Sequence, residues 1–181
     1  MKMHSSSLAP VALVLALCGC ATASQPTPQP TEKVLARTNA GEIRSYEGKQ
    51  SGTIIVKGSS DQVFEALRSA YGDLGIDVEL WDPPHGQVGN RNFTKMYRLA
   101  GDRMSHFVGC GITEMGQASD AFRITMSMVS DVTAAGDGWQ IDTRLDAHAD
   151  DLASSKGRIA CQSRGTLEEK LNNLVAKHLG S

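Results

Sequence analysis

The sequence predicts an α+β fold, a two-layer sandwich with an antiparallel sheet and with an N-proximal helix and a C-terminal helix packed on one face. Two stretches with helical apolar spacing lie near the start and the end of the chain. Between them run segments in which apolar and polar residues alternate strictly, as expected for a sheet covered on one side. With 181 residues, 40% of them hydrophobic, the chain has room for one such domain.

The two helices each begin at a recognisable capping pattern. Ser59 with Gln62 three residues later predicts a capping box for a helix over residues 60–74, which Gly75 ends. Thr166 with Glu169 predicts the same for the C-terminal helix. The apolar stripes are Val63, Phe64, Leu67, Ala70, Tyr71 and Leu74 in the first helix, and Leu167, Leu171, Leu174, Val175 and Leu179 in the second.

The clearest strands lie on either side of Ala135-Gly136-Asp137-Gly138, a hairpin turn whose glycines can adopt positive φ. Apolar residues alternate from Phe122 to Val132 before this turn and from Trp139 to Ala149 after it. A first strand pair is predicted at residues 42–48 and 52–57, and residues 93–102 are interpreted as a loop or a short helix. Further strands are predicted at residues 76–80, 87–92, 106–111 and 158–163.

The N-terminus has the pattern of an export signal. Lys2 and His4 precede an apolar run over residues 8–17, which is too short to cross a bilayer. The run ends in Leu17-Cys18-Gly19-Cys20, which resembles a bacterial lipobox, with Leu17 three positions before the cysteine and the small Gly19 directly before it. Pro- and Thr-rich residues follow and predict a disordered tether over residues 20–40.

The lipoprotein resemblance implies that residues 1–19 are a signal peptide and that Cys20 becomes the lipidated N-terminus. Its acyl chains, palmitate among them, would then hold the chain in the lipid bilayer. Residues 41–181 would form a single globular domain. Ala21 is not aspartate, which in the lipoprotein family implies the periplasmic face of the outer membrane. The alternative is a plain secretory signal, cleaved near Ala21 or Ala23.

Two cysteines remain after Cys18 and Cys20 are assigned. Cys110 and Cys161 are one possible disulfide pair in an exported domain, where oxidation is permitted. The alternative is a pair of buried free thiols, because cysteine also packs as a small hydrophobic residue.

The charge balance and the absence of known motifs limit the classes of function that the sequence supports. Without residues 1–19 the chain has 17 basic and 20 acidic residues, and 5% of all its residues are aromatic, which argues against nucleic acid as a partner. No catalytic, metal-binding or phosphate-binding motif is present, so neither a cofactor nor a metal is predicted. The segment around the Pro-Pro turn is the best candidate contact surface, although Trp81 could equally pack under a loop. Its possible partner-contact residues are Trp81, Pro83, Pro84 and Tyr97.

The order of strand, helix, strands and helix is similar to the small α+β domains of BamC-type outer-membrane assembly lipoproteins, and more loosely to helix-grip ligand-binding folds. Cys110-Gly111 and Cys161 with Gly165-Thr166-Leu167-Glu168 also resemble uncharacterised envelope lipoproteins, which implies a shared disulfide domain. We therefore expect a non-enzymatic envelope lipoprotein that binds another envelope protein. The alternatives are a small apolar-ligand carrier of helix-grip type and, third, an enzyme.

Overall fold

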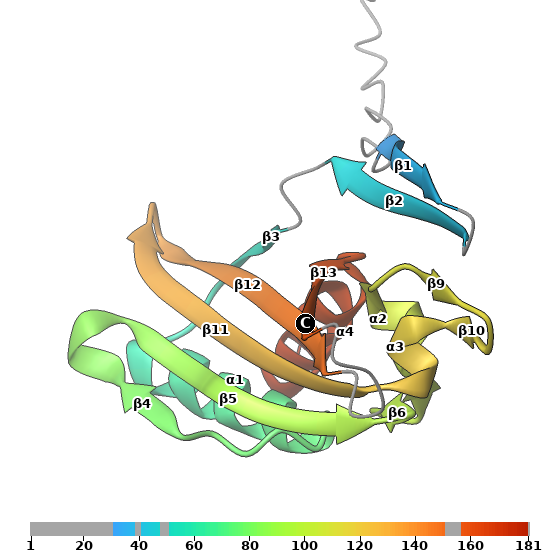
Figure 1. Cartoon of the computed structure of the whole chain (residues 1–181). Coiled ribbons are helices and arrows are strands. Elements are labelled where there is room, and N and C mark those ends of the chain that lie inside the picture. The colour runs from blue at the N-terminus through green and yellow to red at the C-terminus, as the bar shows by residue number, and fades with distance from the viewer. Residues whose placement is uncertain (1–30, 39–40, 48–50, 151–156, 181) are drawn as a thin grey trace, which may run out of the picture.

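A seven-stranded antiparallel sheet is the centre of the fold (Figure 1). The computed structural model describes residues 31–38, 41–47, 51–150 and 157–180, so the predicted signal peptide and Cys20 lie outside the described residues. The strands are ordered β4-β5-β11-β12-β13-β8, and β3 also pairs with β12. Their bounds are Ser51–Val56 (β3), Leu80–Asp82 (β4), Gln87–Met96 (β5), Val108–Gly109 (β8), Arg123–Ala135 (β11), Gly138–Asp150 (β12) and Arg158–Ser163 (β13).

The predicted central hairpin is confirmed. β11 and β12 pair without a register break from Arg123 opposite Asp150 to Ala135 opposite Gly138. The two residues left in the turn are Gly136 and Asp137, and Gly136 has φ 61°. A two-residue turn with positive φ matches the twist of paired strands, which is why glycine is favoured there.

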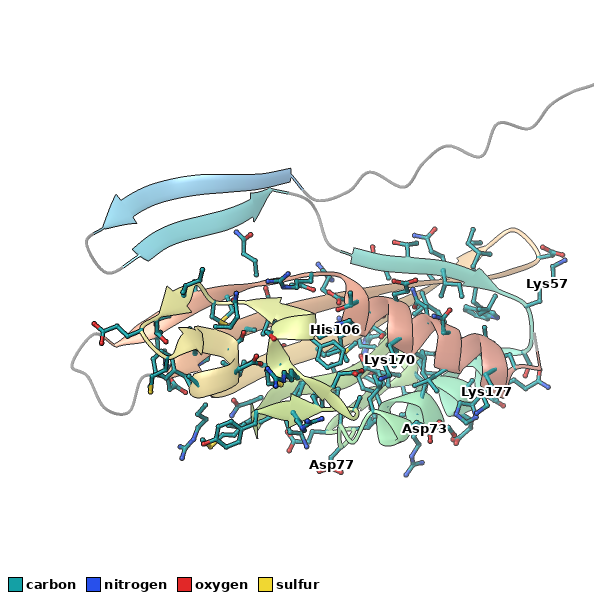
Figure 2. All side chains as sticks on the ribbon, turned by 90° about the vertical axis from the view of Figure 1, so that its right-hand side faces the viewer. Lys57, Asp73, Asp77, His106, Lys170 and Lys177 are labelled. Carbon is teal, nitrogen blue, oxygen red and sulfur yellow. A yellow bond between two sulfur atoms is a disulfide. The ribbon has the colours of Figure 1, made fainter. Side chains whose placement is uncertain are left out.

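Both predicted helices are present and lie on the same side of the sheet (Figures 1 and 2). α1 spans Ser60–Asp73 and begins with the predicted capping box of Ser59 and Gln62. α4 spans Thr166–His178. Together with the antiparallel sheet they make the predicted two-layer α+β sandwich.

The predicted capping box at the start of α4 is not formed. The N-cap is Gly165 with φ 78°, a left-handed conformation that glycine adopts at little cost. Thr166 instead donates a hydrogen bond of 2.6 Å from its hydroxyl to the backbone carbonyl of His106. The helix start is thus tied to a distant loop rather than capped by its own side chain.

The N-terminal strands pair differently from the prediction. β2 (Gly41–Glu47) and β3 match the two predicted strands, but β2 pairs with β1 (Thr31–Thr38), and β3 pairs with β12. β1 lies within residues 20–40, where the Pro-rich composition predicts a tether. The last proline of that segment is Pro30, so residues 31–38 lack the residue that disfavours strand pairing.

The segment after the Pro-Pro turn also differs. β5 continues to Met96 through the range predicted as a loop or a short helix. A bulge places Arg91 and Asn92 opposite Ser127, which breaks the alternation that the sequence pattern relies on. The predicted strand over residues 106–111 is reduced to the short β8, because its first two residues belong to helix α2 (Met104–Phe107). The predicted strand over residues 76–80 begins only at Leu80.

A 3-10 turn spans Pro83–His85, between β4 and β5. Further short elements lie between β5 and β11, namely β6 (Arg98–Leu99), β7 (Asp102–Arg103), β9 (Ile112–Thr113), β10 (Gly116–Gln117) and α3 (Ala118–Ala121). Within the described ranges, no helix combines the length and the apolar character needed to cross a membrane.

The core fills the space between the sheet and the helices. The largest fully buried side chains come from α1, α2, α4 and the inward face of β11 and β12, and they include Tyr71, Phe107, Leu67, Met128 and Leu171. Burial of a large apolar side chain contributes about 1.5–3 kcal/mol, so this layer supplies most of the driving force for folding.

Helix α4 approaches the sheet most closely at Gly52 of β3. A Cβ atom on Gly52 would lie 2.5 Å from Glu168 Cβ and 3.2 Å from the Glu168 carbonyl carbon. A side chain at position 52 would therefore push the helix backbone away from the sheet.

We predict that Gly52→Ala lowers the free energy of unfolding by about 1–3 kcal/mol, the usual cost of overpacking. Gly72→Ala is the matched control. Gly72 lies on α1, and a Cβ atom at this position would meet no atom within 4 Å. Replacing a helical glycine in open space should raise stability by about 0.5–1 kcal/mol. Urea unfolding of both variants measures the difference, and equal effects would contradict the close packing of α4.

Candidate functional site

The predicted disulfide is confirmed. The sulfur atoms of Cys110 and Cys161 are 2.04 Å apart, and the two Cα atoms are 4.2 Å apart. Cys110 follows β8, and Cys161 lies in β13, directly beside the point where these two strands pair. The bridge therefore ties the segment of short elements between β5 and β11 to the main sheet.

Trp81 is partly exposed and held in place by helix α1. It lies on the edge strand β4, and 40% of it is accessible to solvent. Its ring meets the Phe64 ring edge-on at 6.0 Å between centroids, and the Arg68 guanidinium lies 5.4 Å from the ring centroid. Trp81 is thus both packed and exposed. One side of the residue lies against α1, and the rest faces solvent.

The other predicted contact residues do not form one surface with Trp81. Pro83, half-buried, and Pro84, exposed, follow it directly in the 3-10 turn. Tyr97 lies beyond the other end of β5, eight residues after Gly89, where β4 pairs with β5. Eight residues of strand extend about 26 Å, so the four residues divide into two separate places.

Sequence reasoning missed three exposed apolar residues near Tyr97. Met96 precedes it, and Ile112 and Met115 belong to the β9–β10 hairpin, with Met115 80% exposed. Thr113-Glu114-Met115-Gly116 contains a glycine with φ 108° and has the composition of a tight turn, which was the available signal for an exposed tip.

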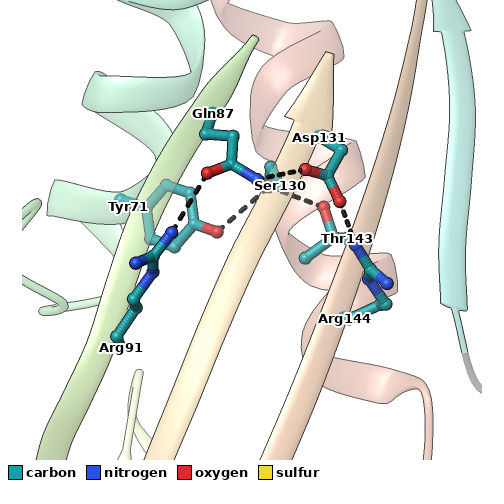
Figure 3. Close-up of polar contacts among 7 residues, drawn as sticks. All are labelled: Tyr71, Gln87, Arg91, Ser130, Asp131, Thr143 and Arg144. Atoms are coloured by element: carbon teal, nitrogen blue, oxygen red, sulfur yellow. Dashed lines mark hydrogen bonds and ion pairs between the residues drawn. The ribbon is translucent and has the colours of Figure 1, made fainter. Parts of the chain in front are cut away.

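A chain of hydroxyl groups crosses the core between α1 and the sheet (Figure 3). Tyr71 Oη lies 3.0 Å from Ser130 Oγ, which lies 2.7 Å from Thr143 Oγ1. Burial raises the pKa of the Tyr71 phenol well above its usual value. All three residues are fully buried, so these linked hydroxyl groups hold α1 against β11 and β12 and are not accessible to a substrate.

The opposite face of the same strands is polar (Figure 3). Gln87 donates a hydrogen bond of 2.9 Å to Asp131, and Arg91 donates one of 3.1 Å to Gln87. Arg144 forms an ion pair with the other oxygen of Asp131. These contacts link β5, β11 and β12 across the face that the helices do not cover.

Glu168 is a buried carboxyl group at the start of α4. Its Oε1 accepts a hydrogen bond of 2.6 Å from Ser163 Oγ, whereas Oε2 is buried and has no hydrogen-bond partner. Burial raises the pKa of this carboxyl above its usual range. Removal of a charged oxygen from water without a partner is unfavourable, which favours the protonated form in the fold.

The histidines lie apart in the described part of the chain. His85 is 2.9 Å from Asp82, His178 is 2.9 Å from Asp73, and His148 is 3.8 Å from Asp150. His106 packs edge-on against Phe107. No group of three or more metal-ligating side chains occurs among the described residues.

A surface groove of about 530 Å³ runs beside the ends of α1 and α4. Figure 2 shows Lys57 and Lys177 at this end of the molecule. The lining is mixed, with charged, polar and small apolar side chains. The groove is lined by Lys57, Gly58, Gln62, Glu65, Ala66, Ser69, His178 and Leu179.

We predict that Glu168→Gln stabilises the protein at pH 7 but not at pH 4. In the unfolded chain this carboxyl ionises near pH 4.5, whereas in the fold it ionises at a higher pH. The fold therefore binds more protons than the unfolded chain above pH 4.5, and the contribution of Glu168 to stability falls as pH rises through its folded pKa. Thermal unfolding from pH 4 to pH 8 measures this dependence.

Glu169→Gln is the matched control for this experiment, because Glu169 is the exposed neighbour on the same helix turn. It should show no comparable pH-dependent gain. A Glu168→Gln effect of equal size at pH 4 and pH 7 would contradict the role of ionisation.

No family model matches the chain, and no curated protein matches it at a significant level. The functional argument therefore depends on the residues and contacts described above.

Proposed function

We propose that the chain is a lipid-anchored cell-envelope protein, held in the membrane through Cys20, whose exported domain binds another envelope component and has no catalytic role. The observation that carries this proposal is the disulfide between Cys110 and Cys161. Disulfides form and persist in oxidising compartments outside the cytosol, so the bridge agrees with export. The lipobox resemblance of Leu17-Cys18-Gly19-Cys20 supplies the anchor and favours the periplasmic face of the outer membrane.

The surface around Trp81 is the best candidate for the protein contact. Partly exposed tryptophan is enriched among residues that dominate binding energy. Phe64 and Arg68 already hold the ring, so little side-chain entropy is lost when a partner covers it. Pro84 beside it is exposed and has a fixed backbone φ, which adds a second rigid contact.

The filled core favours this function over that of a helix-grip ligand carrier. A carrier needs apolar space between the sheet and the C-terminal helix. Tyr71, Phe107 and Leu171 are fully buried in that layer, and the groove of about 530 Å³ has a lining of mixed charged, polar and apolar residues. The filled core therefore supports binding of a partner at the surface of the domain rather than binding of a ligand inside it.

We predict that Cys20→Ala releases the chain from lipid modification. The variant should lack the added acyl mass and should remain as an unprocessed precursor, because the acceptor thiol is absent. Cys18→Ala is the matched control and should retain normal processing, since Cys18 leaves with the signal peptide. Intact mass spectrometry and membrane fractionation measure both, and a Cys20→Ala mass that differs from the wild type only by the cysteine-to-alanine replacement would refute the anchor.

We predict that a photo-crosslinking residue at position 84 captures the same partner as one at position 81. Trp81→Ala combined with the crosslinker at position 84 should lower the yield about tenfold, the effect of losing a dominant contact residue. A crosslinker at Ile55 is the control, because Ile55 is 66% exposed and lies on β3, away from β4. The same product from positions 55 and 84 would contradict a specific surface at Trp81.

A further inference from the structure

One end of the sheet carries a group of exposed apolar side chains. Met96 is 41% exposed, Tyr97 57%, Ile112 48% and Met115 80%. Single exposed apolar residues are normal on a protein surface, whereas a group at one end marks an interaction site. Figure 1 shows β6 and the β9–β10 hairpin, which border these residues, at the opposite end of the molecule from β4.

Backbone and side-chain contacts hold the two loops together. Met104 N donates a hydrogen bond of 3.0 Å to the Tyr97 carbonyl, which fixes Tyr97 in its positive-φ conformation of 64°. The next residue, Ser105, donates to both oxygens of Asp120, at 2.8 Å from its backbone nitrogen and 2.7 Å from its hydroxyl. Asp120 belongs to α3, which directly follows the β9–β10 hairpin. The exposed residues therefore stand on one connected framework.

The charge at this end is opposite to that of the whole chain. The chain has a net charge of −2, yet Arg98, Arg103 and Arg123 are exposed here and form no ion pair with any described residue. Asp102 forms an ion pair with Lys170, whereas Asp120 keeps its charge although it accepts hydrogen bonds from Ser105. Asp120 and the exposed Glu114 therefore offset two of the three arginines, which leaves one positive charge.

The N-terminal hairpin contacts this side of the domain. β2 lies against β9, and β1, its partner in the hairpin, begins at Thr31. Ten residues lie between Cys20 and Thr31. Such a segment spans at most about 40 Å, so an anchor at Cys20 keeps this end close to the membrane that holds the lipid.

We propose that Met96, Tyr97, Ile112 and Met115, with Arg98, Arg103 and Arg123, form a basic apolar end that rests on an anionic phospholipid surface. The arginines contact headgroup phosphates, and the apolar side chains enter the interface beside them. The proposal rests on the lipid anchor proposed above for proximity. Because Trp81 lies at the opposite end of the sheet, this orientation leaves the Trp81 surface facing away from the membrane.

Oxidation of exposed side chains by hydroxyl radicals tests this orientation on the full lipidated chain. The protein is inserted into preformed vesicles of phosphatidylcholine alone or of phosphatidylcholine mixed equally with phosphatidylglycerol. We expect Met115 to be oxidised at least about threefold more slowly on the anionic vesicles, because each basic residue near such a surface strengthens binding about fivefold. Trp81 and Ile55, exposed elsewhere, should be oxidised equally on both.

Reversing the charge of two arginines shows whether the protection of Met115 comes from contact with anionic lipid or from general shielding by the vesicle. Arg98→Glu combined with Arg103→Glu should abolish the protection of Met115 on anionic vesicles. Arg68→Glu is the matched control, since Arg68 is an exposed arginine beside Trp81. Met104 directly follows Arg103 and is fully buried, so a rise in its oxidation reports unfolding of this region.

Equal oxidation of Met115 on the two kinds of vesicle, or protection shared by Trp81, would overturn the proposal. The anchor is read separately from the intact mass of the purified chain. If no acyl mass is found, the chain is mixed with the same vesicles at high lipid concentration, where protection of Met115 by anionic lipid is still expected. Equal rates in that mixture would also overturn the proposal, whereas protection would support it without the anchor.

Discussion

The pairing of β11 with β12 positions almost every other element of the domain. Thirteen residues of each strand pair without a register break, so the inward face of this hairpin presents a continuous surface to the helices, apolar except for the hydroxyl groups of Ser130 and Thr143. β5 pairs along the free edge of β11, and β3 and β13 divide the free edge of β12 between them. A shift of one residue in this hairpin would turn every core side chain to the polar face, so its register is strongly determined.

Regular periodicity made the main elements predictable, and interruptions of periodicity hid the others. The alternation in β11 and β12 and the Ser59–Gln62 box were sufficient for the central hairpin and α1, because local pattern and tertiary packing agree there. The bulge at Arg91 and Asn92 shifts the inward phase of β5, and a strand with a broken period resembles a loop in sequence. Thr166 was misassigned as a cap because its partner, the carbonyl of His106, is sixty residues away in the sequence.

The candidate sites also divide into one that the sequence could predict and others that it could not. The disulfide could be predicted by counting cysteines, since the predicted assignment of Cys18 to a signal peptide and of Cys20 to lipidation leaves Cys110 and Cys161 as the remaining pair. The contact surface could not, because the length of β5 decides whether Trp81 and Tyr97 are neighbours, and that length depended on the unrecognised bulge. Exposure of Met115 likewise depends on a short hairpin that has no apolar period of its own.

The two ends of the sheet differ in how they are stabilised, and this difference follows from the fold. Trp81 stands on a strand supported by α1, so its position is fixed by the main core. Apart from Met96 and Arg123, which belong to β5 and β11, the basic apolar end is built from loops and short elements, which the disulfide joins to the sheet and Lys170 joins to α4. Reduction of the bridge would therefore loosen the proposed membrane-facing end while leaving the Trp81 surface in place. The disulfide stabilises the loops at this end rather than the central hairpin, which is consistent with these loops forming a binding surface.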